Sequence, residues 1–294
     1  MSDKYNDAIA ASSVVTDDAA VKAAVEKIVK DNFDACNTTE VHKFLLNTVD
    51  LTTLNSTDSP SSVAQFVERV NAFDEEHPEL PNVAAICTYP NFAPVVRTVL
   101  DVSKVDVCCV TGNFPSSQTF IEVKVAETAL AVDAGADEID IVLNLGNFFD
   151  GDYEEVCDEM IEQKQACRDA RMKVILETGA LKTAENIKKA SVLALYSGAD
   201  FLKTSTGKGY PGASLEAAYV MCQCIREYFE KTGTMVGFKA SGGVRTTDEA
   251  VQYYCIVKEV LGEKWLTNEY FRIGASSLAN NLLTSIMGEE TKCF

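Results

Sequence analysis

Two lysines are placed where they could form a pair of neighbouring amines. Lys203 and Lys239 each follow a short apolar run and precede a loop rich in glycine, serine and threonine, in Phe201-Leu-Lys-Thr-Ser-Thr-Gly and Phe238-Lys-Ala-Ser-Gly-Gly. An amine beside an ammonium group in a dry pocket loses its proton more easily, and only a neutral amine attacks a carbonyl. The pair therefore predicts a lysine that forms a Schiff base.

The two lysines can meet only if their strands end at the same edge of a sheet. Apolar, β-branched runs recur about every thirty residues, as expected for strand-helix-strand units. They occupy residues 44–49, 83–87, 105–110, 139–143, 174–176, 201–202, 235–238 and 271–273. Amphipathic stretches between them span residues 119–134, 153–170, 183–196, 215–230 and 247–261. This α/β alternation predicts a (β/α)8 TIM barrel, with a doubly wound open sheet as the alternative.

Further polar residues fall at or near the ends of these predicted strands, which form the mouth of a barrel. Asp50 follows the first strand, and Asp140 lies within the fourth between Ile139 and Ile141. A buried carboxylate needs a partner, and an interior lysine would provide one for Asp140. Small residues after the seventh and eighth strands, where barrels commonly hold phosphate, predict an anion site. They are Gly242, Gly243, Gly274, Ser276 and Ser277.

The composition is that of an ordinary soluble globular protein. A net charge of -18 over 294 residues repels nucleic acid and anionic membranes, so no partner of either kind is expected. The first residues lack the basic and apolar regions of a secretory signal, and we expect a cytoplasmic protein. The ten cysteines lack metal-ligand spacing, and several lie in apolar runs, so we interpret them as structural thiols. A phosphate-loop motif is also excluded, because Leu202 and Gly209 occupy its required positions.

The chain divides into three regions. Residues 1–40 form a helical extension, in which residues 17–29 place apolar side chains on one face, and we expect it to cap the bottom of the barrel. Residues 41–286 form the barrel, and residues 287–294 form a C-terminal tail.

The motifs at the predicted mouth resemble those of deoxyribose-phosphate aldolase. They run in order from about residue 44 to residue 286, whereas residues 1–40 have no counterpart. The matching segments are Asp50-Leu-Thr-Thr-Leu, Ala84-Ala-Ile-Cys, Asn113-Phe-Pro, Gly135-Ala-Asp-Glu-Ile-Asp140, Glu177-Thr-Gly, Ala199-Asp-Phe-Leu-Lys-Thr-Ser-Thr-Gly-Lys208, Gly237-Phe-Lys-Ala-Ser-Gly-Gly-Val-Arg-Thr246 and Arg272-Ile-Gly-Ala-Ser-Ser277.

This resemblance implies a class I aldolase without metal or other cofactor. Such an enzyme reversibly cleaves 2-deoxy-D-ribose 5-phosphate to D-glyceraldehyde 3-phosphate and acetaldehyde. Lys203 corresponds to the Schiff-base lysine, Lys239 to the neighbouring cation and Asp140 to the acid/base. Asp50 is expected either to orient Lys239 or to bind substrate. The other substrate-binding positions that the resemblance implies are Thr52, Cys87, Thr206, Gly207, Lys208, Gly242, Gly243, Gly274, Ser276 and Ser277. The resemblance also implies a homodimer.

The tail departs from the family pattern. Better-studied members end in a tyrosine that assists proton exchange, whereas this chain ends in Phe294, which has no hydroxyl group. Reduced activity is therefore expected. Two alternatives remain open from the sequence: a Schiff-base aldolase for another phosphorylated aldehyde, and a barrel that serves as a scaffold for an unidentified protein partner.

Overall fold

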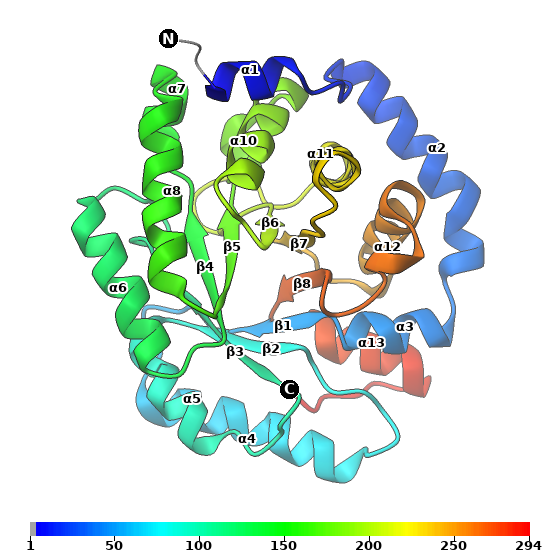
Figure 1. The fold of residues 1–294 in the computed structure, drawn as a ribbon. Coiled ribbons are helices and arrows are strands. Elements are labelled where there is room, and N and C mark those ends of the chain that lie inside the picture. The colour runs from blue at the N-terminus through cyan, green and yellow to red at the C-terminus, as the bar shows by residue number, and fades with distance from the viewer. Residues whose placement is uncertain (1–3) are drawn as a thin grey trace.

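The computed structural model describes residues 4–294 as a barrel of eight parallel strands enclosed by helices (Figure 1). Each strand pairs with the next one along the chain, and β8 pairs with β1 to close the barrel. The strands are β1 Val49–Thr52, β2 Ala85–Thr88, β3 Asp106–Val110, β4 Glu138–Val142, β5 Arg171–Ile175, β6 Phe201–Lys203, β7 Gly237–Ser241 and β8 Phe271–Ala275. The predicted TIM barrel is thus confirmed, and the open sheet is excluded.

One predicted strand is wrong. Residues 39–46 form a helix, α3, which begins after the Thr38 cap, and strand β1 begins only at Val49. The apolar run Phe44-Leu-Leu also satisfies helical spacing, and Leu45 and Leu46 are buried on the inner face of α3. Asp50 consequently lies inside a strand instead of after it, and its carboxylate is buried.

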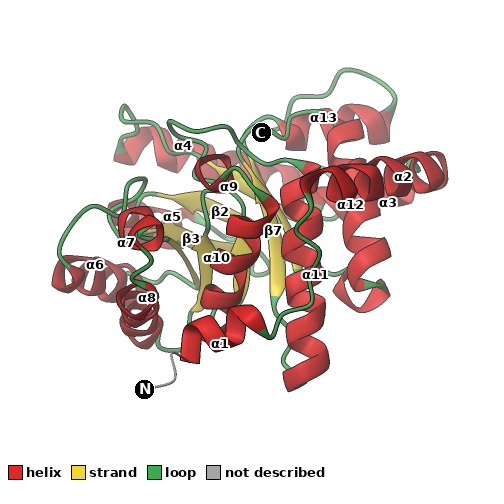
Figure 2. Ribbon diagram, turned by 90° about the horizontal axis from the view of Figure 1, so that it is seen from above, coloured by secondary structure: helices red, strands yellow, loops and turns green. Residues whose placement is uncertain are grey.

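Helices cover the outside of the barrel (Figure 2). The α-helices are α1 Lys4–Ala10, α2 Asp18–Cys36, α3 Thr39–Leu46, α4 Pro60–Glu76, α5 Ala93–Val99, α6 Ile121–Asp133, α7 Leu145–Asp150, α8 Tyr153–Cys167, α9 Thr178–Leu181, α10 Ala184–Tyr196, α11 Leu215–Thr232, α12 Thr247–Leu261 and α13 Leu278–Met287. Two short 3₁₀ helices, Pro90–Phe92 and Glu263–Trp265, complete the described secondary structure. Local caps fix several starts: Ser214 caps α11, and Thr246 forms a capping box with Glu249 at α12.

Helix α2 of the N-terminal extension packs beside the outer helices and does not cap the bottom of the barrel as expected. Helix α2 buries Val21 and Val25 and packs against α11 and α12. Asp18 accepts a hydrogen bond from the first amide of α10, and Asn37 bonds to Asp248 near the start of α12. Both hydrogen bonds join the ends of α2 to the starts of helices that follow the carboxyl ends of strands. Helix α2 itself lies outside the helical layer, along α11 and α12 (Figure 1).

The tail is fixed between α4 and α13. The amides of Cys293 and Phe294 each donate to the Asn280 side chain at 3.0 Å, and Asn280 donates in return to the Phe294 carbonyl at 2.7 Å. The Phe294 ring lies 4.8 Å from the Phe73 ring, measured between centroids. The last residues thus contact helices on the outside of the barrel.

No helix within residues 4–294 is both long and apolar enough to cross a membrane.

The close approach of β6 and β7 yields a stability prediction. A Cβ atom at Gly237 would come within 2.5 Å of three atoms of the buried Phe201 ring. Because this ring is enclosed, Gly237→Ala is expected to lower the free energy of unfolding by about 1–3 kcal/mol in urea denaturation. The control is Gly146→Ala in α7, where the added methyl group would lie 3.4 Å from two flexible side chains. Equal stability of the two variants would contradict this packing.

Candidate active site

Lys203 and Lys239 share one carboxylate oxygen at the centre of the barrel. The Nζ atom of each lysine lies 2.7 Å from Oδ2 of Asp140. The two strands are paired with Lys203 opposite Lys239, so both side chains leave the backbone at the same level. Lys203 is only 3% exposed, and Lys239 and Asp140 are fully buried. The three residues predicted to be catalytic are therefore in direct contact.

A second layer of charges surrounds this group. Asp50 pairs with Lys239 and also accepts a hydrogen bond from Arg272 at 2.7 Å. Lys173 donates to the other oxygen of Asp140 at 3.1 Å and pairs with Glu138. Arg272 also reaches Glu138, at 3.1 Å. Every member of this network is enclosed by the barrel, which requires pairing of opposite charges, because a lone buried charge is costly.

These neighbours set the ionisation of the carboxylates and of two lysines. Burial by itself would raise the pKa of Asp140, but Lys173, Lys203 and Lys239 outweigh it and hold that pKa well below its usual range. The pKa of Asp50 is likewise lowered, because Lys239 and Arg272 overcome the effect of burial. Burial would lower the pKa values of Lys173 and Lys239, yet the adjacent carboxylates raise both. The two carboxylates are thus charged, and Lys173 and Lys239 remain ammonium groups.

A cavity of about 300 Å³ opens above Lys203. The other residues that line it are Thr52, Leu54, Asn55, Thr206, Gly207, Lys208, Ser241, Gly242, Gly243, Val244, Arg245, Gly274, Ala275, Ser276 and Ser277. Most of the predicted substrate-binding positions therefore face one space. Asp50, Asp140 and Lys239 lie beneath it, and Cys87 is buried beside them, so none of the four is among the described lining residues.

Gly274 has a second role beside the cavity. A Cβ atom at this position would lie 3.1 Å from Cε of Lys239 and 3.0 Å from Cβ of Ser241. The missing side chain leaves room for the stem of Lys239, so Gly274 contributes to the lysine pair as well as to the lining.

Sequence reasoning missed Lys173, Arg272 and Arg245 as functional positions. Lys173 lies in Arg171-Met-Lys-Val-Ile, where polar and apolar residues alternate as they do in Glu138-Ile-Asp-Ile on the neighbouring strand. Alternation on two adjacent strands places the polar set on one face, here the barrel interior. This pattern could have identified Lys173, whereas Arg245 lies in a loop whose course the sequence does not specify.

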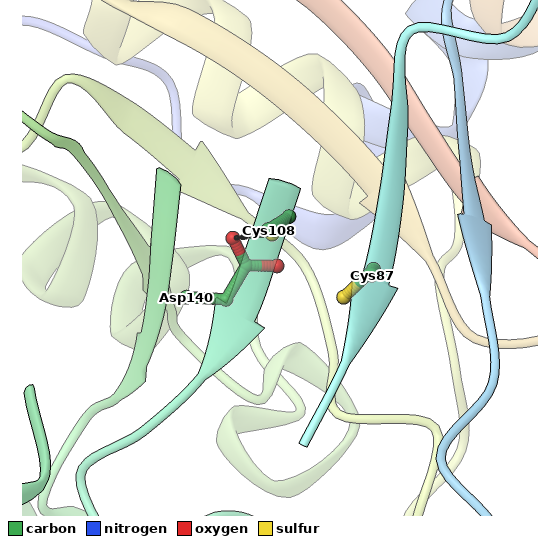
Figure 3. A group of neighbouring side chains, drawn as sticks. All are labelled: Cys87, Cys108 and Asp140. Atoms are coloured by element: carbon green, nitrogen blue, oxygen red, sulfur yellow. Dashed lines mark hydrogen bonds between the residues drawn. The ribbon is translucent and has the colours of Figure 1, made fainter. Parts of the chain in front are cut away.

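Cys87, Cys108 and Asp140 lie close enough together to suggest metal ligands. Their ligand atoms fall within 4.8 Å of one another, and the three side chains project from β2, β3 and β4 (Figure 3). The Cys108 thiol donates to Oδ1 of Asp140 at 3.2 Å, and the amino groups of Lys173, Lys203 and Lys239 occupy the remaining contacts of that carboxylate. A metal cation here would face the ammonium groups of Lys173 and Lys239, so the donor set does not favour one.

The lowered pKa values of the two buried aspartates predict loss of stability in acid. A group with a lowered pKa in the folded state contributes stability above its unfolded pKa of about 4, and this contribution is lost as the pH falls through the folded value. Asp140→Asn should lower the unfolding free energy at pH 7 by about 3–5 kcal/mol, because it leaves buried ammonium groups without their partner.

The variant should also lose less stability than the wild type as the pH falls from about 5 toward 2. Urea denaturation across this range measures both effects, and Asp34→Asn, at an exposed position, is the control. Parallel stability curves for wild type and Asp140→Asn would show that Asp140 is not strongly paired.

Comparison with known proteins agrees with this geometry. Residues 44–280 match the model of the DeoC/LacD family aldolases. A putative deoxyribose-phosphate aldolase of Caenorhabditis elegans is 40% identical over 272 residues, which cover 92% of this chain and 89% of the relative. The Mus musculus deoxyribose-phosphate aldolase is 39% identical, with coverage of 80% and 77%.

Solved structures agree as well. The crystal structure of a putative deoxyribose-phosphate aldolase from Coccidioides immitis matches with a TM-score of 0.69 and 28% identity, covering 83% of this chain and 86% of that one. With its paired lysines, its barrel and these relatives in agreement, the chain belongs to the DeoC/LacD family of aldolases, which are lyases.

Proposed function

We propose that this protein is a class I aldolase that reversibly cleaves 2-deoxy-D-ribose 5-phosphate to D-glyceraldehyde 3-phosphate and acetaldehyde, with Lys203 as the Schiff-base residue. The observation that carries the proposal is the contact of Lys203 and Lys239 with one oxygen of Asp140, beneath a cavity that Lys203 lines. The names of the relatives supply the substrate.

The balance of buried charge supports a neutral amine in this cluster. With every lysine protonated, the four cations Lys173, Lys203, Lys239 and Arg272 face the three carboxylates of Asp50, Glu138 and Asp140. Release of one proton makes this buried group neutral, and an excess of like charge favours that release. Lys173 and Lys239 have raised pKa values, so Lys203, the lysine that faces the cavity, is the proposed donor of that proton.

The proposed reaction begins when neutral Lys203 attacks the aldehyde carbon of the open-chain sugar. Proton transfers convert the resulting carbinolamine to a protonated imine, and water leaves. Removal of the proton from the C3 hydroxyl breaks the C2–C3 bond, and its electron pair moves toward the imine nitrogen to give an enamine and free D-glyceraldehyde 3-phosphate. The enamine carbon then takes up a proton, and water releases acetaldehyde. Asp140, 2.7 Å from Lys203 Nζ, is placed to carry protons in these steps.

The far side of the cavity suits the phosphate group. Gly242, Gly243, Ser276 and Ser277 line it, and α13 begins directly after Ser277, so its free amides favour an anion. Lys208 and Arg245 add two positive charges. Lys208 donates to the Leu54 carbonyl at 2.8 Å, which holds its ammonium group between the loops that follow β1 and β6.

Borohydride trapping tests the Schiff base. Incubation with acetaldehyde and sodium borohydride should add a two-carbon group to Lys203, located by peptide mass mapping, and Lys203→Arg should abolish both the adduct and turnover of 2-deoxyribose 5-phosphate. Lys30→Arg is the control, because Lys30 lies at an exposed position on α2, outside the site.

An adduct without turnover would favour another phosphorylated aldehyde as substrate. A folded protein with neither adduct nor turnover would leave the scaffold alternative and contradict the proposal.

We further propose that Phe294 limits turnover, because a phenyl ring cannot exchange protons. Phe294→Tyr should raise the turnover of 2-deoxyribose 5-phosphate, up to the factor of about 10²–10⁴ that a positioned acid/base contributes. The new hydroxyl reaches the cavity only when the tail leaves Asn280 and Phe73. Phe294→Leu, which lacks a hydroxyl, is the control. Unchanged turnover in Phe294→Tyr would contradict the proposal that Phe294 limits turnover.

A further inference from the structure

Glu177 has a backbone conformation that its residue type rarely adopts. It follows β5 with φ of 57° and ψ of 58°, in the left-handed region that favours glycine. Its side chain is 2% exposed, although carboxylates are seldom buried without a partner. A residue retained in an unfavourable conformation indicates that the side chain has a task at this position.

The buried carboxylate holds one residue of the loop after β6. Oε1 accepts a hydrogen bond from the Thr206 amide at 3.2 Å, and Oε2 accepts one from the Thr206 hydroxyl. The Thr206 hydroxyl oxygen in turn accepts from the Lys208 amide at 3.0 Å. Burial raises the pKa of Glu177, and the two Thr206 hydrogen bonds act in the opposite direction. Glu177 therefore fixes Thr206 and, through its hydroxyl, the Lys208 amide, while the Lys208 ammonium group is held by the Leu54 carbonyl.

The neighbouring strand holds the other part of the same loop. Ser241 on β7 donates its amide to the Thr204 hydroxyl at 2.9 Å, and its own hydroxyl donates to the Ser205 carbonyl. Residues 204 and 205 are thus fixed from β7, whereas the side-chain contacts that fix Thr206 from outside the loop come from Glu177. Beyond Thr206 the chain passes through Gly207 and Gly209, both with positive φ, a conformation that glycine adopts without strain.

We infer that Glu177 is a positioning residue for the phosphate group of the substrate. It orders Thr206, Gly207 and Lys208, which line the cavity, whereas Glu177 is not among the described lining residues. A loop that is already ordered before binding does not lose conformational entropy when the ligand arrives, so the tether strengthens binding of the part of the substrate that contacts this loop. The inference rests on the proposed aldolase function for the identity of that substrate.

The test compares ligands with and without phosphate in Glu177→Gln, which keeps the size of the side chain but cannot accept both hydrogen bonds from Thr206. The dissociation constant for inorganic phosphate, measured by calorimetry, should rise about tenfold, the effect of losing one hydrogen bond to a charged group. KM for 2-deoxyribose 5-phosphate should rise by a similar factor, with a much smaller change in kcat. The kcat/KM for unphosphorylated 2-deoxyribose should fall far less. Glu154→Gln, at an exposed position on α8, is the control.

Unchanged phosphate affinity in Glu177→Gln would overturn the inference, as would equal losses with both sugars or a wild type that binds no inorganic phosphate. If Glu177→Gln does not fold, Thr206→Val removes the same hydroxyl contact from the other side and should weaken phosphate binding by a similar factor; unchanged affinity there also overturns it. The calorimetric result does not depend on turnover. Absence of a Lys203 adduct would therefore refute the aldolase proposal without deciding the role of Glu177.

Discussion

The carboxylate of Asp140 is the contact on which the rest of the site depends. One of its oxygens meets both Lys203 and Lys239, and the other meets Lys173. Three cations could not remain together inside a barrel without this shared anion, because their mutual repulsion in a medium of low polarity would be too great. Lys239 also pairs with Asp50 and Lys173 with Glu138, whereas Asp140 is the carboxylate that Lys203 contacts. Asp140 thus permits the three lysines to gather, as the Schiff-base chemistry proposed for Lys203 requires.

The barrel supplies the geometry that this contact requires. Closure brings β4, β5, β6 and β7 side by side, with Asp140 opposite Lys173 and Lys203 opposite Lys239 in the strand register. Small residues then admit close approaches at the mouth: Gly274 leaves room for the stem of Lys239, and a Cβ at Gly212 would collide with the backbone of Gly242. The loops after β6 and β7 therefore pack directly on each other, and this contact holds one side of the proposed phosphate site in place.

The sequence predicted the parts of the structure that depend on local pattern. The eight-strand alternation and the placement of Lys203 at a strand end were readable because strands and loops differ in composition over a few residues, whereas Lys239 lies in the middle of β7 and not at its end. The run at Phe44 was misassigned because three apolar residues fit a helix and a strand equally well. Lys173 could be found only from the alternation of polar and apolar residues on β4 and β5 taken together, because a single lysine in a strand resembles a surface residue. The contact of Glu177 with Thr206 depends on a left-handed turn and on two separate loops, and neither can be read from residue types.

The charged residues inside the barrel are explained by the proposed reaction and not by a contribution to stability. The apolar core lies between the strands and the helices, where side chains such as Ile139, Ile141 and Leu202 are fully buried. Inside the strands, the positions that usually hold branched apolar residues carry Asp50, Glu138, Lys173, Lys239 and Arg272. Replacement of buried ion pairs by packed apolar groups is often neutral or stabilising, so folding alone would not retain this network. The reaction proposed for Lys203, which needs a neutral amine among fixed charges, does require it. The apolar layer outside the strands provides the stability that allows the interior to remain charged.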